Sequence, residues 1–227
     1  MTSLASTLLG TSALLLIPSL AGAADLFGQP APLLAASPPG FYIHAGPGGL
    51  ILDESARISA GGFPVANGNI AVPSQPSLLL ETGYFVTPNI GISFTGGIPP
   101  LARFYGTGAL GGLGKLGSAV YGPTALTAHY HVTSLGAFQP YIGGGAVYMV
   151  VFKTNDGALK QANLENAWGA TLQIGADYMI NEHWGAFFDV KKAYLRSKAT
   201  GFLGAAPIVA KVRLDPLVLH TGIAYRF

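Results

Sequence analysis

The chain has 227 residues, of which 50% are hydrophobic and only 10% are charged, and its formal net charge is +2. Soluble domains carry about 25% charged residues, so this composition argues against a disordered chain and a typical soluble enzyme, and the small net charge gives no footprint for nucleic-acid binding. The sequence contains no cysteine, which excludes a disulfide scaffold, a cysteine-ligated zinc site and a cysteine nucleophile.

The first residues of the chain resemble a secretory signal peptide. An apolar core at residues 13–17 precedes residues 21–23, whose small-x-small form is typical of a signal-peptidase site. No Lys or Arg precedes the core, and the alternative interpretation is an N-terminal membrane anchor. An anchor needs an apolar run of about 20 residues, and this run is shorter. We therefore predict a signal peptide over residues 1–23 and a proline-rich periplasmic leader over residues 24–39.

The rest of the sequence offers no candidate for a membrane-spanning helix. Its longest apolar run, residues 138–152, is interrupted by Pro140 and by three consecutive glycines that begin at Gly143. Within lipid, only helices and closed β-barrels satisfy all of their backbone hydrogen bonds. A hydrophobic, exported chain without spanning helices is therefore expected to form a closed β-barrel, and residues 40–227 are predicted to be that single domain.

Alternation of apolar and polar residues with a period of two predicts eight strands. In chain order they cover residues 40–51, 75–86, 89–98, 119–133, 139–152, 164–180, 184–197 and 208–227. Three of the connections between them are short, and four, at about 52–74, 99–118, 153–163 and 198–207, are long. Short turns at one end and long loops at the other are typical of outer-membrane barrels. The predicted fold is all-β, a transmembrane, antiparallel, up-and-down barrel of eight strands with both termini on the periplasmic side.

The predicted strand at residues 164–180 shows the alternation most clearly. Its even positions from Trp168 to Ile180 are apolar or aromatic, and its odd positions from Gly169 to Asp177 are small or polar. Trp168 and Tyr178 are ten residues apart, which at a rise of about 3.3 Å per residue and a tilt of about 40° corresponds to roughly 25 Å. That is the height of the apolar belt of a membrane barrel, so the two aromatic residues are predicted to mark its edges.

The same parity assigns the polar face of each strand to the barrel interior. The predicted lumen-lining residues are Glu81, Thr95, Thr127, His129, Thr171, Gln173, Asp177, Asp189, Lys191 and Arg226. The interior of an eight-stranded barrel is only just wide enough for side chains to fill it. One interpretation of the charged residues is therefore a plug, in which Asp177 and Asp189 pair with Lys191 and Arg226.

The long connection at residues 99–118 is rich in glycine and in apolar side chains. Residues 106–111 spell G-x-G-x-x-G, but a dinucleotide site also needs a following helix, which the glycines that come next oppose. We predict instead a mobile loop whose apolar residues form a mouth that gathers hydrophobic solutes. The mouth residues are Leu101, Phe104, Leu110, Leu113 and Leu116. The alternative is a loop that packs on itself.

No motif in the sequence predicts catalysis or cofactor binding. His129 and His131 share one strand face, and such a pair is able to bind a metal, but no third ligand stands out. Neutral histidines suit hydrogen bonding in the lumen, because each ring both donates and accepts. The Gly-x-Ser-x-Gly motif of hydrolases is also missing. We predict no enzyme activity, no catalytic residues, no cofactor and no metal site.

The chain ends on an aromatic residue that closes an alternating strand. Tyr225 and Phe227 share the apolar face of that strand. This ending resembles the C-terminal signal that the bacterial barrel-assembly machinery recognises, so Tyr225 and Phe227 are the predicted assembly signal.

Several blocks of the sequence follow the pattern of a known family. They are residues 122–132 (GPTALTAHYHV), 138–148 (FQPYIGGGAVY), 168–169, 175–178, 181–184, 212–216 and 222–227. These blocks resemble the OmpW family (outer-membrane protein W), over residues 40–227 and most specifically in the second half. The resemblance implies an eight-stranded barrel with a narrow, apolar lumen, passive entry of small hydrophobic molecules and a lateral exit into the bilayer. Thr95 and Lys191 depart from it, because they are polar at heights where it implies an apolar constriction.

These features predict a protein of the outer membrane of a Gram-negative bacterium. Its predicted function, which rests on the resemblance, is passive diffusion of small, mainly hydrophobic molecules across that membrane. The alternative is a non-conducting structural or adhesion barrel, with a plug of charged residues and extracellular loops that bind partners. The expected partners are outer-membrane lipid and lipopolysaccharide, the barrel-assembly machinery and small hydrophobic solutes, with no nucleic acid. We expect a monomer.

Overall fold

The fold comes from a computed structural model, which describes residues 39–227. The predicted signal peptide and all but the last residue of the predicted leader lie outside the described residues. The strands are β1 (Gly40–Ile51), β2 (Ser55–Ala60), β3 (Phe63–Pro64), β4 (Gly68–Ala71), β5 (Gln75–Phe85), β6 (Ile90–Gly97), β7 (Leu101–Gly108), β8 (Lys115–His131), β9 (Phe138–Asp156), β10 (Lys160–Leu164), β11 (Ala167–Met179), β12 (Trp184–Leu203), β13 (Ala206–Arg213) and β14 (Leu217–Arg226). Two short 3-10 turns are η3 (Gly111–Leu113) and η4 (Thr133–Leu135). Within residues 39–227, no helix has the length and apolar character to cross a membrane.

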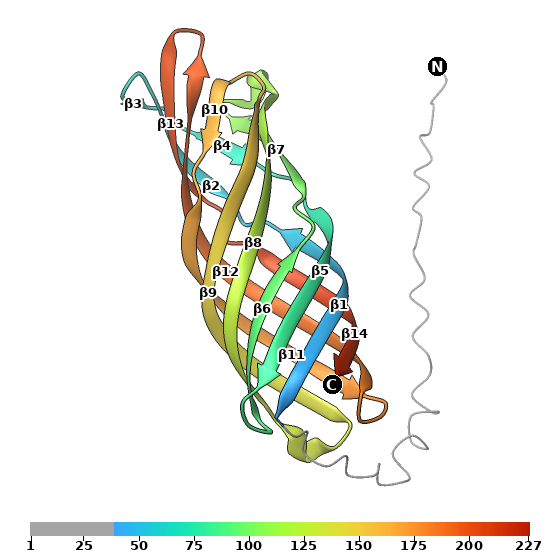
Figure 1. The fold of residues 1–227 in the computed structure, drawn as a ribbon. Helices are drawn as coiled ribbons and strands as arrows, with labels where there is room; N and C mark the ends of the chain where they lie inside the picture. The colour runs from blue at the N-terminus through green and yellow to red at the C-terminus, as the bar shows by residue number, and fades with distance from the viewer. Residues whose placement is uncertain (1–38) are drawn as a thin grey trace, which may run out of the picture. The chain divides into compact units, whose positions relative to one another are not determined.

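Eight of the strands close into a barrel (Figure 1). Their order around it is β1, β5, β6, β8, β9, β11, β12 and β14, each antiparallel to its neighbours. β14 returns to pair with β1, where Tyr225 lies opposite Ile43. Closure removes the free strand edges that lipid would leave without hydrogen-bond partners. The predicted all-β, eight-stranded, antiparallel barrel is confirmed.

The four long connections prolong the barrel at one end instead of forming irregular loops. β12 continues past the barrel wall and pairs with β13, which in turn pairs with β2. β8 and β9 also continue, β7 pairs with both β8 and β4, and β10 pairs with β12. These strands form the upper part of the molecule in Figure 1, which we call the extension, whereas the short turns lie at the lower end, near the C-terminus.

Two of the predicted strands are wrong in their extent. The predicted final strand, residues 208–227, is divided between β13 and β14. Pro216 has no N–H to donate to a sheet, and Asp215 has a φ of 27°, far from the extended range. The interruption redirects the chain, so that β13 pairs with β12 and β2 while β14 pairs with β12 and β1. The predicted strand at residues 164–180 is likewise divided between β10 and β11.

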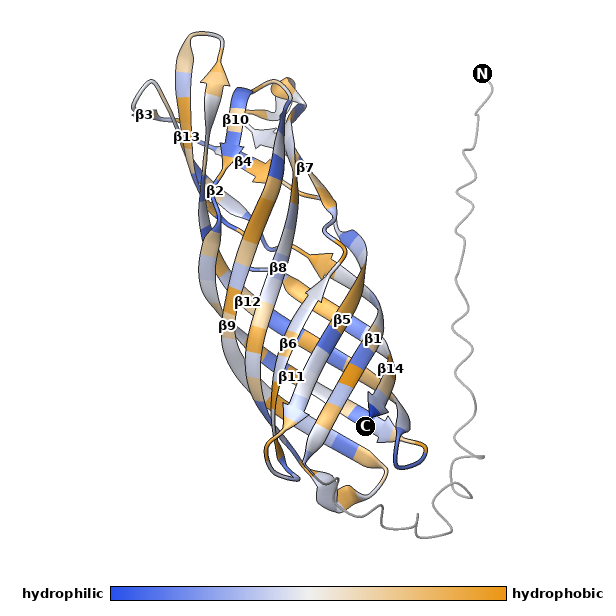
Figure 2. Cartoon of the chain, in the orientation of Figure 1, coloured by the Kyte–Doolittle hydropathy of each residue, from blue (hydrophilic) through white to orange (hydrophobic). Residues whose placement is uncertain are grey.

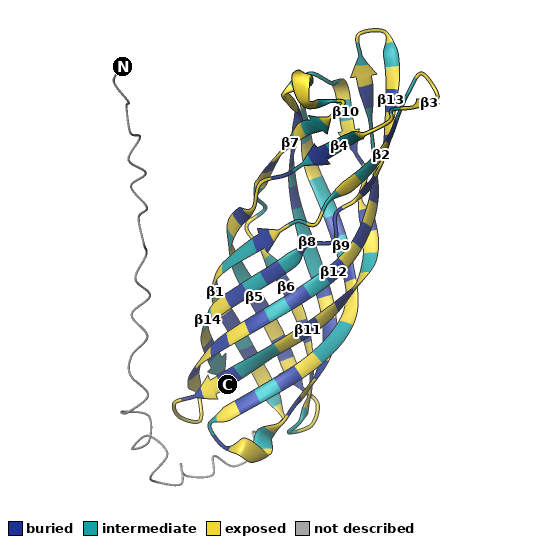
Figure 3. Cartoon of the chain, turned by 180° about the vertical axis from the view of Figure 1, so that it is seen from behind, coloured by how far each residue is buried: buried dark blue, intermediate teal, exposed yellow. Residues whose placement is uncertain are grey.

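Side chains along the barrel strands alternate between the interior and the outer surface. On β5 and β6 buried residues alternate with exposed ones, and Figure 3 shows the same alternation around the wall. The exposed positions carry large apolar residues, among them Leu80, Phe94, Leu126, Ile142, Leu172, Ile174, Phe188 and Ile223. Figure 2 shows hydrophobic residues recurring as orange bands along the strands. A continuous apolar belt on the outside is favourable only against lipid.

The interior has two parts of opposite character. Toward the short-turn end, the buried side chains are mainly polar or charged, as at His44, Glu81, Asp177, Asp189 and Lys191. Toward the long-connection end they are apolar, and they form the hydrophobic core with Leu50, Ile58, Ile70, Met149, Leu195, Ile208 and Val212. The candidate functional site lies where these two parts meet.

Candidate functional site

An apolar cavity of about 170 Å³ lies inside the long-connection end, and we call it the upper cavity. Its apolar lining includes Ile58, Val65, Ile70, Phe104, Leu110, Leu113, Leu116, Leu159, Leu164, Leu203 and Ile208. An apolar cavity of about 150 Å³ in another protein stays dry and binds benzene. The upper cavity therefore has room for an apolar molecule of roughly one aromatic ring.

Most of the predicted mouth residues line the upper cavity, namely Phe104, Leu110, Leu113 and Leu116. Leu101 does not line it, because it is 41% exposed on the outer face of β7 while its neighbour Ala102 is fully buried. The glycine-rich connection thus turns its apolar side chains inward as the wall of a cavity.

Sequence reasoning missed the lining that comes from the other long connections. Ile58 lies on β2, Ile70 on β4 and Ile208 on β13. A signal for two of them was present in the sequence, because Ile58 and Ile208 each stand in a run in which every second residue is apolar, Ala56 to Ala60 on β2 and Ile208 to Val212 on β13. That signal is short in each case, and it becomes a wall only when β13 pairs with β2.

Toward the short-turn end, the upper cavity is closed by an apolar constriction. Its residues are Leu52, Val72, Phe104, Tyr121, Met149, Leu164 and Leu214. The space among these side chains does not admit a water molecule. Phe104 and Leu164 line both the upper cavity and the constriction. The constriction therefore opens only when these side chains move.

A smaller cavity of about 40 Å³, the lower cavity, lies beyond the constriction. Its lining is mixed, with Leu50, Leu79, Val147, Ala193 and Val218 beside Thr95, Thr171 and Lys191. One further set of lining residues belongs to the barrel wall where β6 and β8 separate, namely Gly97, Ile98, Pro100, Gly122 and Pro123. The lower cavity thus reaches from the interior to the wall.

The barrel wall is interrupted between β6 and β8. Thr95 opposite Ala125 is the last pair that joins β6 to β8. The next pair along this seam joins β7 to β8 and places Leu101 opposite Val120. Between these two pairs the strands separate, and we call this opening the lateral gap.

Prolines explain the lateral gap. Pro99, Pro100 and Pro123 lack the backbone N–H that a sheet requires on each strand. The N–H of Tyr121 reaches across to the carbonyl of Pro100 in a long hydrogen bond of 3.4 Å. The strands are therefore held only weakly together at this height.

A shallow groove on the outer surface begins at the lateral gap. Leu79, Gly97 and Ile98 line both this groove and the lower cavity. The rest of the groove is formed by residues of β5 and β6 and is largely apolar, with Leu78, Leu80 and Phe94. The lower cavity and the lipid-facing surface therefore share part of their lining.

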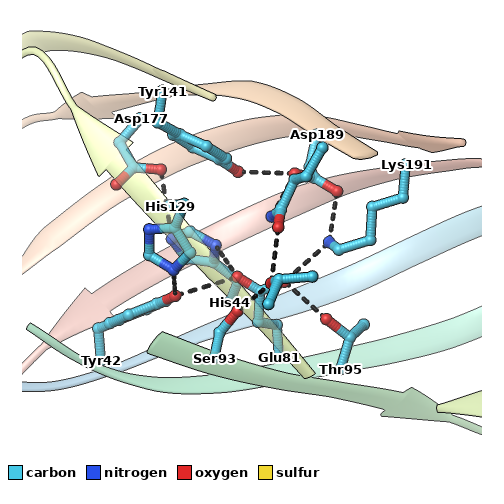
Figure 4. Close-up of polar contacts among 12 residues, drawn as sticks. Tyr42, His44, Glu81, Ser93, Thr95, His129, Tyr141, Asp177, Asp189 and Lys191 are labelled. Carbon is cyan, nitrogen blue, oxygen red and sulfur yellow. Dashed lines mark hydrogen bonds and ion pairs between the residues drawn. The ribbon is translucent and has the colours of Figure 1, made fainter. Parts of the chain in front are cut away.

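Below the lower cavity, polar side chains fill the barrel (Figure 4). Lys191 on β12 donates to Glu81 on β5 at 2.8 Å and to Asp189 at 2.5 Å, and all three are buried. Thr95 and Tyr42 also donate hydrogen bonds to Glu81, at 2.7 and 3.1 Å. Each carboxylate is thus held by the shared ammonium group and by neutral donors.

The second carboxylate of this cluster ties further strands together. Asp189 accepts hydrogen bonds from Gln173 at 2.8 Å and from Tyr141 at 3.0 Å. Thr127 in turn donates to Gln173 at 2.8 Å. The network therefore connects β8, β9, β11 and β12 across the lumen.

A second cluster lies around Asp177, and His44 lies between it and Glu81. Arg226 donates to Asp177 and to Gln139, in each case at 2.8 Å. The Nε2 atom of His44 lies 3.3 Å from Asp177. The structure thus pairs Arg226 with Asp177 and Lys191 with Asp189, and adds Glu81 as a second partner of Lys191.

His129 and His131 are hydrogen-bonded to each other. Nε2 of His131 lies 2.8 Å from Nδ1 of His129, and Nε2 of His129 lies 2.8 Å from the hydroxyl of Tyr42. Because Tyr42 gives its proton to Glu81, a neutral His129 must donate to Tyr42 and accept from His131. Among residues 39–227, no three His, Asp or Glu side chains are placed to hold a metal ion.

Two inward-facing glycines make room for the rings of this network. A Cβ atom added at Gly175 would lie 2.5 Å from the hydroxyl oxygen of Tyr141, and one at Gly83 would lie 2.5 Å from that of Tyr42. Any larger residue at either position would displace a donor of the network.

All ten predicted lumen-lining residues are buried in the structure. Thr95, Thr171 and Lys191 line the lower cavity, and the polar clusters contain most of the others. His131, which the sequence predicts to hydrogen-bond in the lumen, is also buried. Sequence reasoning missed a further set of buried polar side chains, namely Tyr42, His44, Ser93, Gln139, Tyr141 and His220. Parity would have found most of them, but Tyr141 lies on a strand that is apolar on both faces.

Comparison with known proteins gives consistent matches over nearly the whole described chain. A sequence model of the OmpW family matches residues 39–227. PahQ of Pseudomonas aeruginosa, a dibenzothiophene metabolism operon protein, is 33% identical over 202 residues, which cover 89% of this chain and 95% of PahQ. Outer membrane protein AlkL of Ectopseudomonas oleovorans is 30% identical over 175 residues, which cover 77% of this chain and 76% of AlkL.

Solved structures agree with these relatives. The crystal structure of the outer membrane protein OprG from Pseudomonas aeruginosa matches with a TM-score of 0.79 and 26% identity, over 84% of this chain and 97% of OprG. The family match, the named outer-membrane relatives and the closed barrel with its lipid-facing belt lead to one assignment. The chain belongs to the OmpW family and is a β-barrel of the outer membrane of Gram-negative bacteria.

Proposed function

We propose that the protein lets small, mainly hydrophobic molecules enter passively through the upper cavity and leave sideways, through the lateral gap, into the membrane. The observation that carries this proposal is the shared lining of the lower cavity and the lateral gap by Gly97, Ile98 and Pro100. An interior space bounded by a weakly bonded wall gives an apolar solute a short route to lipid.

The apolar lining favours entry of such solutes. Transfer of apolar surface from water into a protein interior lowers the free energy by about 25 cal/mol per Å². The upper cavity therefore concentrates hydrophobic molecules, and movement of Phe104 and Leu164 admits them to the lower cavity. From there the lateral gap leads to the outer groove at Leu79 and Ile98.

The polar interior disfavours an axial route to the periplasm. A solute on that route would have to separate Lys191 from Glu81 and Asp189, which are buried and fully paired. Breaking such a pair costs several kcal/mol, and an apolar solute supplies no hydrogen bonds in return. The same clusters that close the axis leave the lateral gap as the lower-energy exit.

The class of solute follows from the cavity and is supported by a relative. The upper cavity, at about 170 Å³, has room for roughly one aromatic ring. The name of PahQ refers to the metabolism of dibenzothiophene, an apolar fused-ring aromatic compound. We therefore propose small aromatic and other apolar molecules as the solutes.

A disulfide across the lateral gap tests this route. A Cβ atom on residue 122 would lie 3.8 Å from the Cβ of Pro99, which matches the usual separation of about 3.8 Å in disulfides. The native chain contains no cysteine, so Pro99→Cys/Gly122→Cys introduces a single possible bond. We expect oxidation to slow uptake of an uncharged hydrophobic fluorophore into cells, and reduction to restore it.

The two single variants are the controls, because each changes the wall without closing it. Uptake that is unchanged by oxidation of the double variant would exclude the lateral gap as the exit. Equal uptake in cells with and without the protein, at matched membrane integrity, would instead favour the non-conducting structural or adhesion barrel.

A further inference from the structure

A patch of six basic residues lies on the outer face of β2, β12 and β13, at the long-connection end. They are Arg57, Lys192, Arg196, Lys198, Lys211 and Arg213, and we call them the basic patch. The three strands run side by side there, in the upper left of Figure 1. Inward positions of the same strands are apolar and buried, as at Ile58, Ala210 and Val212.

Cations of the basic patch lie directly opposite one another in the sheet. Lys198 is paired with Lys211, and Lys211 is paired with Arg57. Two residues along the strands, Arg196 is paired with Arg213. Paired residues project from the same face, and like charges at such positions destabilise a sheet. An arrangement of this kind needs anions to balance it.

Acidic residues of the chain balance part of the patch. Three ion pairs are formed, between Lys192 and Asp53, Lys198 and Glu165, and Arg213 and Asp215. Arg57, Arg196 and Lys211 form no ion pair or side-chain hydrogen bond with another residue of the described chain. Half of the basic patch is therefore available to an anion from outside.

The position of the patch along β12 indicates which anion it meets. The outward residues of this strand run, in order, Phe188, Val190, Lys192, Tyr194, Arg196 and Lys198. They change from apolar to basic at Lys192, and Tyr194, a residue type typical of the membrane interface, lies among the cations. Arg196 and Lys198 follow Tyr194 by two and four residues, or roughly 5 and 10 Å along the membrane normal at a rise of about 3.3 Å and a tilt of about 40°.

An amphiphile fits this surface better than a free anion does. The apolar wall immediately below the patch includes Phe188, Val190 and Leu219, which acyl chains are able to cover. The cations stand at the height of headgroups, and long connections of outer-membrane barrels are extracellular. Arginine binds phosphate with two parallel hydrogen bonds.

We propose that the basic patch is a binding site for the phosphorylated glycolipid headgroup of lipopolysaccharide in the outer leaflet. Its phosphates bind between Arg57, Arg196 and Lys211, and its acyl chains lie on the apolar surface of β12 and β14. The site anchors the extension at the long-connection end to the surrounding lipid. It also holds β2 and β13 in place as walls of the upper cavity.

Native mass spectrometry of the full barrel with added lipid A tests the site. The variant Arg57→Gln/Arg196→Gln/Lys211→Gln removes the three cations without an internal partner. The control Lys115→Gln/Lys153→Gln/Lys160→Gln removes the same charge from exposed lysines elsewhere in the extension. Each cation near a membrane surface strengthens binding about fivefold, so the first variant is expected to bind lipid A about 100-fold more weakly than the native protein and the control.

Two further measurements test the phosphates and the acyl chains of lipid A separately. Removing the phosphates from lipid A should weaken its binding to the native protein and should have little further effect on the patch variant. Inorganic pyrophosphate, which has no acyl chains, should compete only at much higher concentration than lipid A. Equal loss of binding in both triple variants, unchanged binding in the patch variant, or competition by pyrophosphate at equal concentration would overturn the proposal.

Discussion

Lys191 and Glu81 form an ion pair of 2.8 Å inside the barrel, although 110 residues separate them in the sequence. β1 and β14 lie between their strands in the wall, so the pair spans the lumen and does not join neighbouring strands. Both side chains are almost fully buried. A buried charge is stable only when it is paired and hydrogen-bonded. This contact therefore determines which side chains meet inside the lower barrel.

Lys191→Leu is expected to destabilise the barrel strongly. The substitution leaves the carboxylates of Glu81 and Asp189 buried without their cation, and breaking a buried pair in this way costs about 3–5 kcal/mol. Urea unfolding of the refolded protein in detergent micelles measures the loss. Lys153→Leu, at an exposed position, is the control and should change stability by no more than about 0.5 kcal/mol. Equal stability of the two variants would contradict the electrostatic account.

Neutralising the whole cluster is expected to leave the transport route unchanged. Glu81→Gln/Asp189→Asn/Lys191→Met removes the charges together, so no carboxylate is left unpaired, and much of the stability lost in Lys191→Leu should return. Because the proposed exit is the lateral gap, uptake of a hydrophobic fluorophore should stay within about twofold of the native rate, a change of less than roughly 0.5 kcal/mol in the barrier. Much faster uptake would show that solutes follow the barrel axis.

The eight-stranded barrel could be predicted from the sequence because parity is a local property. β1 covers residues 40–51, as the alternation predicts, and the turns near Pro88 and Asn181 lie between strands as expected. Parity also separates the buried residues Glu81 and Asp177 from the exposed ones beside them. It needs no knowledge of which strands are neighbours.

The ion-pair partners inside the barrel, the cavities and the extension could not be predicted in the same way, because they depend on the register between strands that are distant in the sequence. Parity places Lys191 inside but does not say whether Glu81 or Asp189 lies within reach. The upper cavity exists because β2 pairs with β13, about 150 residues later, as at Ser59 and Val209. A short strand read alone carries no information about such a pairing.

Ala199→Phe is expected to reduce uptake. Ala199 lines the upper cavity, and an added aromatic ring occupies the space that a solute of one ring would use. We expect uptake to fall about tenfold, the change for a loss of roughly 1.4 kcal/mol of apolar burial. Ala186→Phe, on the lipid-facing side of the same strand, is the control. A similar decrease in both variants, or none in Ala199→Phe, would show that the upper cavity is not on the path.

The stability of the turn after β9 is expected to depend on pH. Hydrogen bonds from the N–H groups of Ala162 and Gln161, at 2.9 and 3.1 Å, hold the pKa of Asp156 below its ordinary value. A carboxylate with a lower pKa in the folded state stabilises the turn at pH values above its unfolded pKa of about 3.9. That stabilisation is lost as the pH falls through the lower, folded pKa. Gln161, with a φ of 51°, depends on these bonds to keep its left-handed backbone.

Amide hydrogen exchange at Gln161 and Ala162 measures this effect. Below about pH 4 exchange of both amides, corrected for its intrinsic pH dependence, should become faster in the native protein. In Asp156→Ala, which removes both acceptor oxygens, exchange should be fast at all pH values and follow the intrinsic rate. Glu182→Gln, in an exposed turn at the other end of the barrel, should leave the pH profile unchanged. A native profile without a step at acidic pH would contradict the role given to Asp156.

Phe227→Ala is expected to impair assembly in cells without impairing the folded barrel. The backbone N–H of Phe227 closes the barrel by donating to the carbonyl of Phe41 at 3.0 Å, and alanine keeps this bond. The ring itself is 64% exposed and packs edge-on against Tyr225 at 4.9 Å, so its removal should change the stability of refolded protein by no more than about 0.5 kcal/mol. If the assembly machinery recognises Tyr225 and Phe227, the amount of folded protein in outer membranes falls while refolding in detergent stays complete.

Phe41→Ala is the control. It removes a ring of similar exposure, 65%, from the neighbouring strand and should assemble normally. Equal amounts of both variants in the membrane would show that the terminal aromatic is not part of the signal.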